Sequence, residues 1–301
     1  MNLTILGCHS ATPKNNTHTT SQLVQFKGNL FLVDCGEGTQ VRLREKKVKF
    51  SRIKNIFISH LHGDHFYGLI GLIGTFRLMG RNTDLNIYGP KGIKELINIQ
   101  LKLSKSRVDF GLYFHELTKS VPEIIFEDQN VKVSTIPLKH RIYTNGFLFE
   151  EKKPLRKLNY EILKKNNIPV YEFKNIKNGK DYINQKGEVV DNELITLTPK
   201  KPFKYAFCSD TGFYTKITNQ IKNVNLLYHE STFLNEHYSL AKKTYHSTAE
   251  QAAKIASLAN VEILMLGHFS TRYRDKSKFL EEAKNEFKNV ILANEGETYN
   301  F

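Results

Sequence analysis

The stretch Ser59-His60-Leu61-His62-Gly63-Asp64-His65 places four side chains that can bind a metal ion within six residues. It directly follows residues 53–58, Ile-Lys-Asn-Ile-Phe-Ile, whose β-branched and aromatic side chains predict a strand. The end of a strand can hold several side chains toward one point. A lone histidine there would be read as part of a solvated loop or of the core. Four such residues after one strand instead predict a metal site.

The spacing within this stretch predicts how the ligands divide. His60 and His62 are two positions apart, so in an extended loop they point the same way and can share one ion. Gly63 permits a sharp turn, after which Asp64 and His65 can face a second ion beside the first. Zinc is the first choice because histidine dominates the set, and the carboxylate makes manganese an alternative.

The form H-x-H-x-D-H resembles the metal-binding motif of the metallo-β-lactamase superfamily. The resemblance implies an α/β fold, an αββα sandwich with a dinuclear metal site at one edge. We therefore expect residues 1–301 to form a single domain of this type, with residues 151–200 inserted in it as an arm.

More ligand-type residues follow predicted strands elsewhere in the chain: Asp34, His140, Asp210 and His268. The resemblance assigns Asp34 to orienting the metal site rather than to binding the metal. It implies two zinc ions per subunit, bridged by Asp210. The first ion is held by His60, His62 and His140. The second ion is held by Asp64, His65 and His268.

Two metal ions about 3.5–4 Å apart can clamp the attacking and leaving oxygens of a phosphodiester and lower the pKa of a shared water. Asp64 can then bind metal and also accept the proton of that water. The ribose oxygen that leaves on RNA cleavage needs a proton. His246 is the candidate donor, since the pKa of histidine suits proton transfer near pH 7, and Glu230 is a candidate to orient its ring. The alternative for His246 is a histidine in a helix-capping turn.

The apolar pattern predicts further elements around these residues. Helices are expected over 66–78, 93–103 and 277–287, and over 249–258 after a cap at Ser247 or Thr248. A strand over 290–293 is expected to be the last.

Composition points to an anionic partner. The 301 residues carry a net charge of +14, which favours nucleic acid or an acidic membrane face, although a generally basic proteome would give the same excess. The three cysteines, Cys8, Cys35 and Cys208, are odd in number and far apart, which argues against disulfides and favours a cytoplasmic location. The N-terminus does not resemble a signal peptide. The longest uncharged apolar run, 66–76, is too short to span a membrane.

Positive charge concentrates between the predicted ligands His140 and Asp210. Residues 152–180 carry nine Lys or Arg against two Glu, with aromatic residues between the charges. A solvated surface loop would look similar, but beside a metal site the pattern favours an arm that binds nucleic acid.

Three motifs narrow the resemblance: His246-Ser247-Thr248, His229-Glu230-Ser231-Thr232-Phe233 and His268-Phe269-Ser270-Thr271-Arg272-Tyr273. Together with the arm, and over nearly the whole chain, they resemble the short form of the ribonuclease Z family of tRNA 3′ endonucleases. The resemblance implies removal of the 3′ trailer from precursor tRNA, leaving a 3′ hydroxyl on the tRNA. It also implies a homodimer in which the arm of one subunit holds the tRNA that the other cleaves.

Two stretches depart from that family. Residues 169–179 keep only Pro169 and Gly179 of a Gly-Pro-rich stretch of the arm. Residues 13–17 lack the Arg-Asn pair that commonly follows the proline in that family. In the family this loop lies near the RNA 3′ end, so the difference concerns how trailers that begin with CCA are treated.

Two rivals remain at this point. A phosphodiesterase, arylsulfatase-like enzyme or lactonase of the same fold, acting on small esters, would need no basic arm. An RNA-binding module with structural zinc would need four protein ligands per ion, whereas here seven residues serve two ions.

Overall fold

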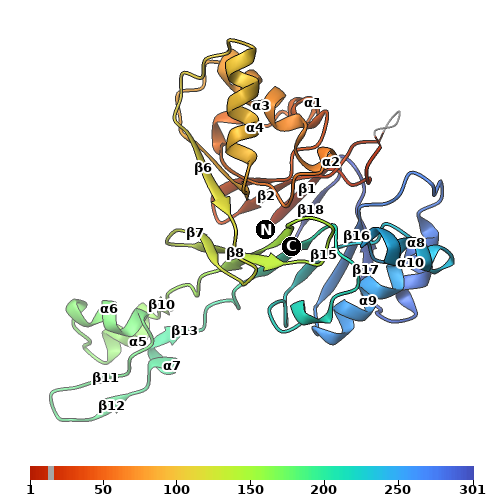
Figure 1. The fold of residues 1–301 in the computed structure, drawn as a ribbon. Helices are drawn as coiled ribbons and strands as arrows, with labels where there is room; N and C mark the ends of the chain where they lie inside the picture. Colours follow the sequence, from red (N-terminus) through yellow and green to blue (C-terminus); the bar gives the residue numbers. More distant parts are fainter. Residues whose placement is uncertain (13–16) are drawn as a thin grey trace.

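The computed structural model describes residues 1–12 and 17–301. Two seven-stranded sheets lie face to face, with helices on their outer faces (Figure 1). The first sheet has the strand order β18 (Thr298–Asn300), β1 (Asn2–Gly7), β2 (Ser21–Phe26), β3 (Asn29–Val33), β4 (Ile53–Phe57), β5 (Leu85–Pro90) and β6 (Leu112–Leu117). The second has the order β17 (Val290–Leu292), β16 (Ile263–Gly267), β15 (Leu226–Glu230), β14 (Lys204–Cys208), β9 (Asn145–Glu151), β8 (Val131–Pro137) and β7 (Ile124–Glu127). The predicted αββα sandwich is confirmed.

Helices cover both sheets. The first sheet packs against α1 (Thr39–Glu45), α3 (Gly68–Leu78) and α4 (Ile93–Leu103), and the short α2 (Gly63–Phe66) precedes α3. The second packs against α9 (Ala249–Leu258) and α10 (Ser277–Lys284), with α8 (Tyr238–Thr244) before them. Short 3₁₀ turns lie at Phe50–Arg52, Val170–Glu172, Thr215–Ile217 and Asn235–His237.

Strand β3 shows why these sequences form a sandwich. Phe31 and Val33 belong to the core between the two sheets, whereas Leu30 and Leu32 belong to the core under the helices. Alternate side chains of a strand point to opposite faces, so an almost continuous apolar run buries both. Across the sandwich, the ring centre of Phe31 lies 5.5 Å from that of Phe149 on β9. Full burial of one such ring stabilises the fold by about 1.5–3 kcal/mol.

Most predicted elements form, with shifted ends. The helices over 93–103 and 249–258 have the predicted bounds, and Thr248 caps the second in a capping box with Gln251. The helix expected over 66–78 is divided into α2 and α3. A Cβ atom at Gly68 would lie 2.0 Å from the carbonyl oxygen of Gly36, so this glycine permits close helix packing. The strand at 290–292 is not the last, because β18 follows it and pairs with β1.

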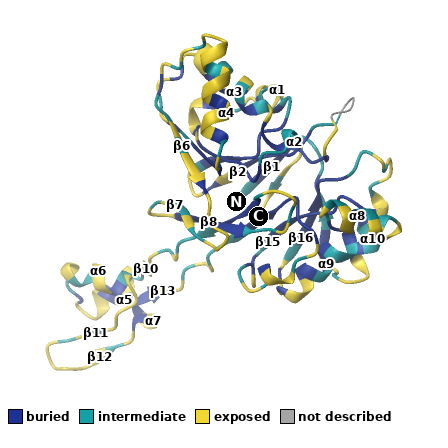
Figure 2. Ribbon diagram, viewed as in Figure 1, coloured by how far each residue is buried: buried dark blue, intermediate teal, exposed yellow. Residues whose placement is uncertain are grey.

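The arm is the segment between β9 and β14, and it projects from the sandwich (Figure 1). It contains β10 (Lys157–Leu158), α5 (Tyr160–Lys165), α6 (Phe173–Lys177), β11 (Tyr182–Ile183), β12 (Val189–Val190), α7 (Asn192–Ile195) and β13 (Thr196–Leu197). Its small core is separate from those of the sandwich and consists of Leu158, Leu163, Ile168, Ile176 and Ile195. Most of the other residues of the arm are exposed or only partly buried (Figure 2).

All three cysteines are buried free thiols, as expected. Burial raises the pKa of the Cys8 thiol to about 12, so it behaves as a small apolar side chain. In the part of the chain that the structure describes, no helix combines the length and the apolar character needed to cross a membrane.

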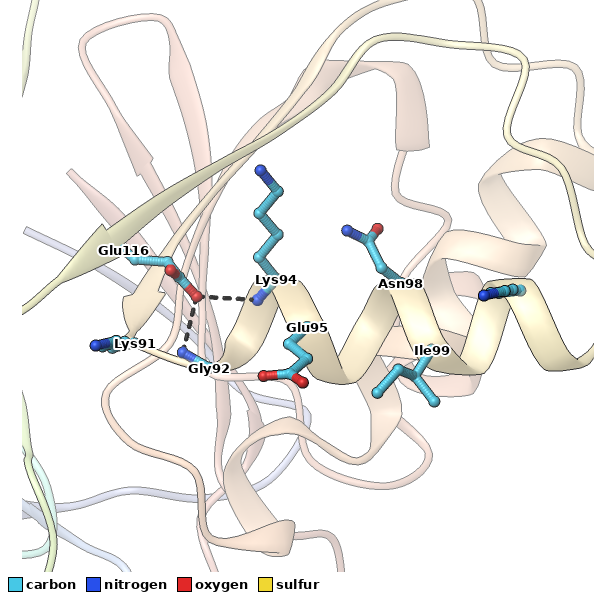
Figure 3. Close-up of a pocket in the computed structure, with 8 residues that line it drawn as sticks. Lys91, Gly92, Lys94, Glu95, Asn98, Ile99 and Glu116 are labelled. Carbon is cyan, nitrogen blue, oxygen red and sulfur yellow. Dashed lines mark hydrogen bonds between the residues drawn. The ribbon is translucent and has the colours of Figure 1, made fainter.

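A hollow of about 390 Å³ lies beside helix α4, at the edge of the first sheet (Figure 3). The Oε1 atom of Glu116 accepts hydrogen bonds from the backbone N–H groups of Gly92 (2.7 Å) and Lys94 (3.3 Å) at the start of the helix. Gly92 is the N-cap and adopts φ +100°, and it contributes no side-chain cap of its own. Glu116, which lies on β6, thus satisfies two backbone amides at the start of α4.

Glu116→Ala is expected to lower the free energy of unfolding by about 1 kcal/mol, because it leaves these helix amides without their acceptor. Urea unfolding followed by circular dichroism measures the change. Glu116→Gln keeps the acceptor oxygen and should retain most of the stability. An equal loss in both variants would show that the negative charge, and not the hydrogen bonds, stabilises the helix end.

Candidate metal centre

The seven predicted metal ligands come together at one edge of the sandwich, although they are up to 208 positions apart in the chain. Most of them lie in loops that follow strands, and two lie in a short helix. His60 and His62 lie in the loop after β4, Asp64 and His65 lie in α2, His140 follows β8, Asp210 follows β14 and His268 follows β16. The strand ends therefore converge on this edge, as the sequence predicts.

Three histidines form the first group. His60 Nε2 lies 3.0 Å from His62 Nδ1, and His140 Nε2 lies 3.3 Å from the same atom. Asp210 Oδ2 lies 3.5 Å from His60 Nε2 and 3.8 Å from His140 Nε2. Four donor atoms thus face a common point.

The second group lies on the other side of Asp210. His65 Nε2 and His268 Nε2 are 3.3 Å apart, and Asp64 Oδ2 lies 3.5 and 3.6 Å from them, respectively. The other oxygen of the same carboxylate, Asp210 Oδ1, lies 3.0 Å from both imidazole nitrogens. One carboxylate therefore presents an oxygen to each group.

These contacts fit divalent cations. Ring nitrogens of neighbouring histidines face each other at 3.0–3.3 Å. A divalent cation between such nitrogens would be bound by their lone pairs in the neutral form of the rings. Imidazole with carboxylate is a donor set suited to zinc and, through the carboxylates, to manganese.

Neighbouring groups hold the outer nitrogens of these rings. Four partners share this role: Ser59 Oγ holds His60 Nδ1 (3.0 Å), Asp34 Oδ2 holds His65 Nδ1 (2.6 Å), the Tyr245 carbonyl holds His140 Nδ1 (3.0 Å) and Thr232 Oγ1 holds His268 Nδ1 (2.9 Å). Such contacts fix the ring orientation and the tautomer of a metal-binding histidine. Asp34 lies where the resemblance placed it, and its carboxylate also accepts from the Ser59 N–H and hydroxyl.

The backbone is strained where it turns into the site. Asp34, Asp210 and His268 have φ values of +56°, +55° and +58°. This left-handed region is uncommon for residues other than glycine, and Asp and His tolerate it better than most. Strain of this kind persists only where surrounding contacts impose it, and it is concentrated at functional sites.

Burial and neighbouring charges both shift the pKa values of these groups. Burial favours the neutral form of Asp210, but His268 and His65 hold its pKa well below the usual value. Burial lowers the pKa of His268, whereas Asp210 and Asp64 raise it, to about 10. Burial and the neighbouring His65 hold the pKa of His60 well below its usual value. The Asp210 carboxylate is therefore charged at neutral pH.

His246 lies beside the cluster, paired with Glu230 as the sequence suggests. Its Nδ1 atom lies 2.7 Å from Glu230 Oε1, and its Nε2 atom lies 4.0 Å from Asp210 Oδ2. Glu230 is fully buried and accepts from the Thr211 N–H (2.8 Å) and the Thr232 N–H (3.1 Å). Burial lowers the pKa of His246, but Glu230 raises it above the usual value.

Comparison with known proteins assigns the family. Residues 1–155 match a family model described as Anti-Pycsar protein Apyc1. Over 293 residues, 97% of this chain and 96% of the other, the sequence is 47% identical to Ribonuclease Z of Bacteroides fragilis. The chain belongs to the ribonuclease Z family. It is also 44% identical over 291 residues to Ribonuclease Z of Porphyromonas gingivalis, covering 97% of this chain and 96% of that protein.

Solved structures agree with the ribonuclease Z assignment. The human tRNase Z, short form, superposes with a TM-score of 0.72 at 26% identity, covering 100% of this chain and 99% of that one. The metallo-β-lactamase fold protein YhfI of Bacillus subtilis superposes with a TM-score of 0.69 at 18% identity, covering 99% of each chain. At that identity, the second match shows only the fold.

Three features of this ribonuclease Z site are absent from the sequence prediction. Arg141 and Arg272 line a hollow of about 280 Å³ at the cluster, and the Ala11 N–H donates to Asp64 Oδ2 (2.8 Å). Arg141 directly follows the ligand-type His140, and Arg272 lies in a quoted motif, so both had a signal in the sequence. The Ala11 contact had none. The predicted departure at residues 13–17 falls largely on 13–16, which lie outside the described residues.

Proposed function

We propose that this chain is a metal-dependent endoribonuclease that removes the 3′ trailer from tRNA precursors and leaves a 3′ hydroxyl on the tRNA. The observation that carries the proposal is the 47% identity to Ribonuclease Z across 97% of the chain. The histidine and aspartate cluster and the basic arm occur in the same chain and supply the two parts that this reaction needs, a hydrolytic centre and an RNA-binding surface.

We assign the metal ligands as two sets that share Asp210. The first set is His60, His62 and His140. The second set is Asp64, His65 and His268. The preferred ion is zinc, two per subunit, with manganese as the alternative. Bound there, the ions would polarise the scissile phosphate and lower the pKa of the attacking water.

The remaining chemistry consists of two proton transfers. The attacking water forms a bond to phosphorus, and its proton passes to a carboxylate oxygen of Asp64. As the bond from phosphorus to the 3′ oxygen breaks, His246 Nε2 donates a proton to that oxygen, and the phosphate stays on the trailer. Glu230 supports this role because its Oε1 atom holds the opposite nitrogen of His246 at 2.7 Å.

Incubating the purified protein with a 3′-extended tRNA precursor and mapping both product ends tests the function. We expect one cut at the end of the mature tRNA sequence, a 3′ hydroxyl on the tRNA and loss of cleavage on chelation, with elemental analysis giving the metal. Hydrolysis of small phosphodiesters or aryl sulfates without cleavage of the precursor would favour the small-ester rival.

Deleting the arm should separate RNA cleavage from small-ester hydrolysis. Residues 152–180 carry a net charge of +7 and contact phosphates in this proposal, so deletion of residues 152–202 should weaken tRNA binding and make it less dependent on salt. The core should remain folded, because Glu150 and Lys204 at the two ends of the arm pair across β9 and β14, and a short linker can join them. Hydrolysis of bis(p-nitrophenyl) phosphate should persist.

Binding at several salt concentrations and both activities measure this outcome. Equal loss of the two activities in a folded, metal-loaded deletion variant would contradict the proposal that the arm binds the tRNA substrate. Limited proteolysis tests the predicted boundaries, 151–200 within a single domain of residues 1–301.

We also propose how the chain assembles and in which compartment it acts. We infer a homodimer from the resemblance to the family, and light scattering of the purified protein measures it. A cytoplasmic location is supported by the free thiols of Cys8, Cys35 and Cys208, since a reducing compartment keeps thiols unpaired.

A further inference from the structure

His246 forms a wall between two hollows. On one side lies the hollow of about 280 Å³ at the cluster of predicted metal ligands, lined by Asp64, Asp210 and His268 among others. On the other side lies a second hollow of about 300 Å³, which contains no residue of the cluster. We call this second hollow the flanking pocket. Its lining is Lys139, Gly212, Phe213, Tyr238, Lys242, Tyr245, His246 and Gln251.

Exposed aromatic side chains distinguish the flanking pocket. Phe213, Tyr238 and Tyr245 are 38%, 48% and 41% exposed. Aromatic rings in such positions can stack on nucleobases, and every base offers a π face to them. Lys139 and Lys242 are also exposed there and can pair with phosphate groups. The pocket therefore combines the two kinds of contact that bind single-stranded nucleic acid.

Hydrogen bonds connect the flanking pocket to the residues of the proposed active site. Tyr245 has φ +58°, and its carbonyl accepts the hydrogen bond from His140 Nδ1. Next to Tyr245, the Gly212 N–H donates to the Lys139 carbonyl (2.9 Å). The same loop reaches Glu230 through the Thr211 N–H. These contacts connect the backbone of the pocket to His140 and to Glu230, which holds His246. A substrate-positioning site needs such a fixed backbone.

The polarity of the reaction decides which part of the RNA occupies the pocket. In the proposed function, on which this inference rests, His246 protonates the 3′ oxygen of the last nucleotide kept on the tRNA. The scissile phosphate must then lie at the metal cluster, on one side of His246. The nucleoside that carries the leaving oxygen must extend from it, past His246.

We propose that the flanking pocket binds the last nucleotide retained on the tRNA, with its base stacked on Phe213 and Tyr238. A third hollow, of about 390 Å³, shares these two side chains and Gln251, so the surface continues away from the cluster. This continuation gives the preceding nucleotides of the acceptor end a path. The trailer then leaves on the side of Ser10 and Arg272, which line the hollow at the cluster.

A fluorescent base analogue tests the position directly. Two precursors carry 2-aminopurine, one at the last retained nucleotide and one at the first trailer nucleotide. In both, a methylene group replaces the leaving 3′ oxygen, so the metal-loaded protein binds them without cleaving them. We expect stacking to quench the probe at the retained position and to leave the trailer probe bright.

Phe213→Leu and Tyr238→Leu should each reduce the quenching and raise the Kd for this precursor by about 5- to 150-fold, the range for loss of one stacked base. Tyr113→Leu is the matched control, because Tyr113 is also an exposed aromatic residue, at 52%, but lies on β6. It should change neither the quenching nor the Kd.

The outcomes separate this inference from the proposed function. Quenching at the trailer position, or quenching that survives both substitutions, overturns the pocket assignment while cleavage of the natural precursor stands. A wild-type protein that cleaves no tRNA precursor overturns the proposed function, and the pocket assignment with it.

Discussion

Replacing Asp64 with alanine is expected to abolish cleavage of a tRNA precursor while leaving tRNA binding largely intact. The carboxylate is assigned two roles, as a metal ligand and as the acceptor of the proton from the attacking water. Its Oδ2 atom lies 3.5 Å from His65 Nε2 and 3.6 Å from His268 Nε2, so the second metal set loses one of its donors. Binding should persist because the arm, the main proposed tRNA contact, is a separate module with its own core.

Cleavage assays and gel-shift binding with the same precursor measure the two effects. Asp64→Asn is the informative companion, since it can still accept the hydrogen bond from the Ala11 N–H but lacks the negative charge. If the charge is what matters, Asp64→Asn should be as inactive as Asp64→Ala. A variant of either kind that cleaves at a rate near that of the wild type would remove Asp64 from both roles.

The predicted ligands at His60, His62, Asp64 and His65 have a local signal in the sequence. In β4 and the loop after it, a short apolar run ends in closely spaced histidines, and strand ends at one edge of a sheet meet in space. The bridging position of Asp210 is different. It came from resemblance to a family, since no local pattern shows which carboxylate lies between two sets of histidines. The structure places one of its oxygens toward each set.

Two of the contacts that the sequence did not predict are made by the backbone. The Tyr245 carbonyl holds His140, and the Ala11 N–H holds Asp64, yet any residue type has these groups. Their positions depend on a left-handed turn at Tyr245 and on packing between segments far apart in the chain. Strand β18 was missed for a related reason. Its short sequence carries little signal, and it exists because it pairs with β1 from the other end of the chain.

Replacing His246 with alanine is expected to lower the cleavage rate by about 10²–10⁴-fold, the usual contribution of a general acid. Its ring is held at Nδ1 by the buried Glu230 carboxylate, which leaves Nε2 to face the substrate. Glu230→Gln should cause a smaller loss of rate, because glutamine still accepts the Nδ1 hydrogen bond but no longer favours the protonated ring. Single-turnover rates on the precursor measure both variants.

Metal content decides what such a loss of rate means for His246. His246, Asp210 and His268 also lie close enough together to hold an ion as a group, so geometry alone permits His246 to be a ligand. As a proton donor it can be removed without loss of metal, since His60, His62 and His140 with Asp210 still complete the first set. Elemental analysis of His246→Ala should therefore match the wild type, whereas His140→Ala should lose metal. A similar deficit in both variants would show that His246 binds metal and that the proton reaches the leaving oxygen from another group.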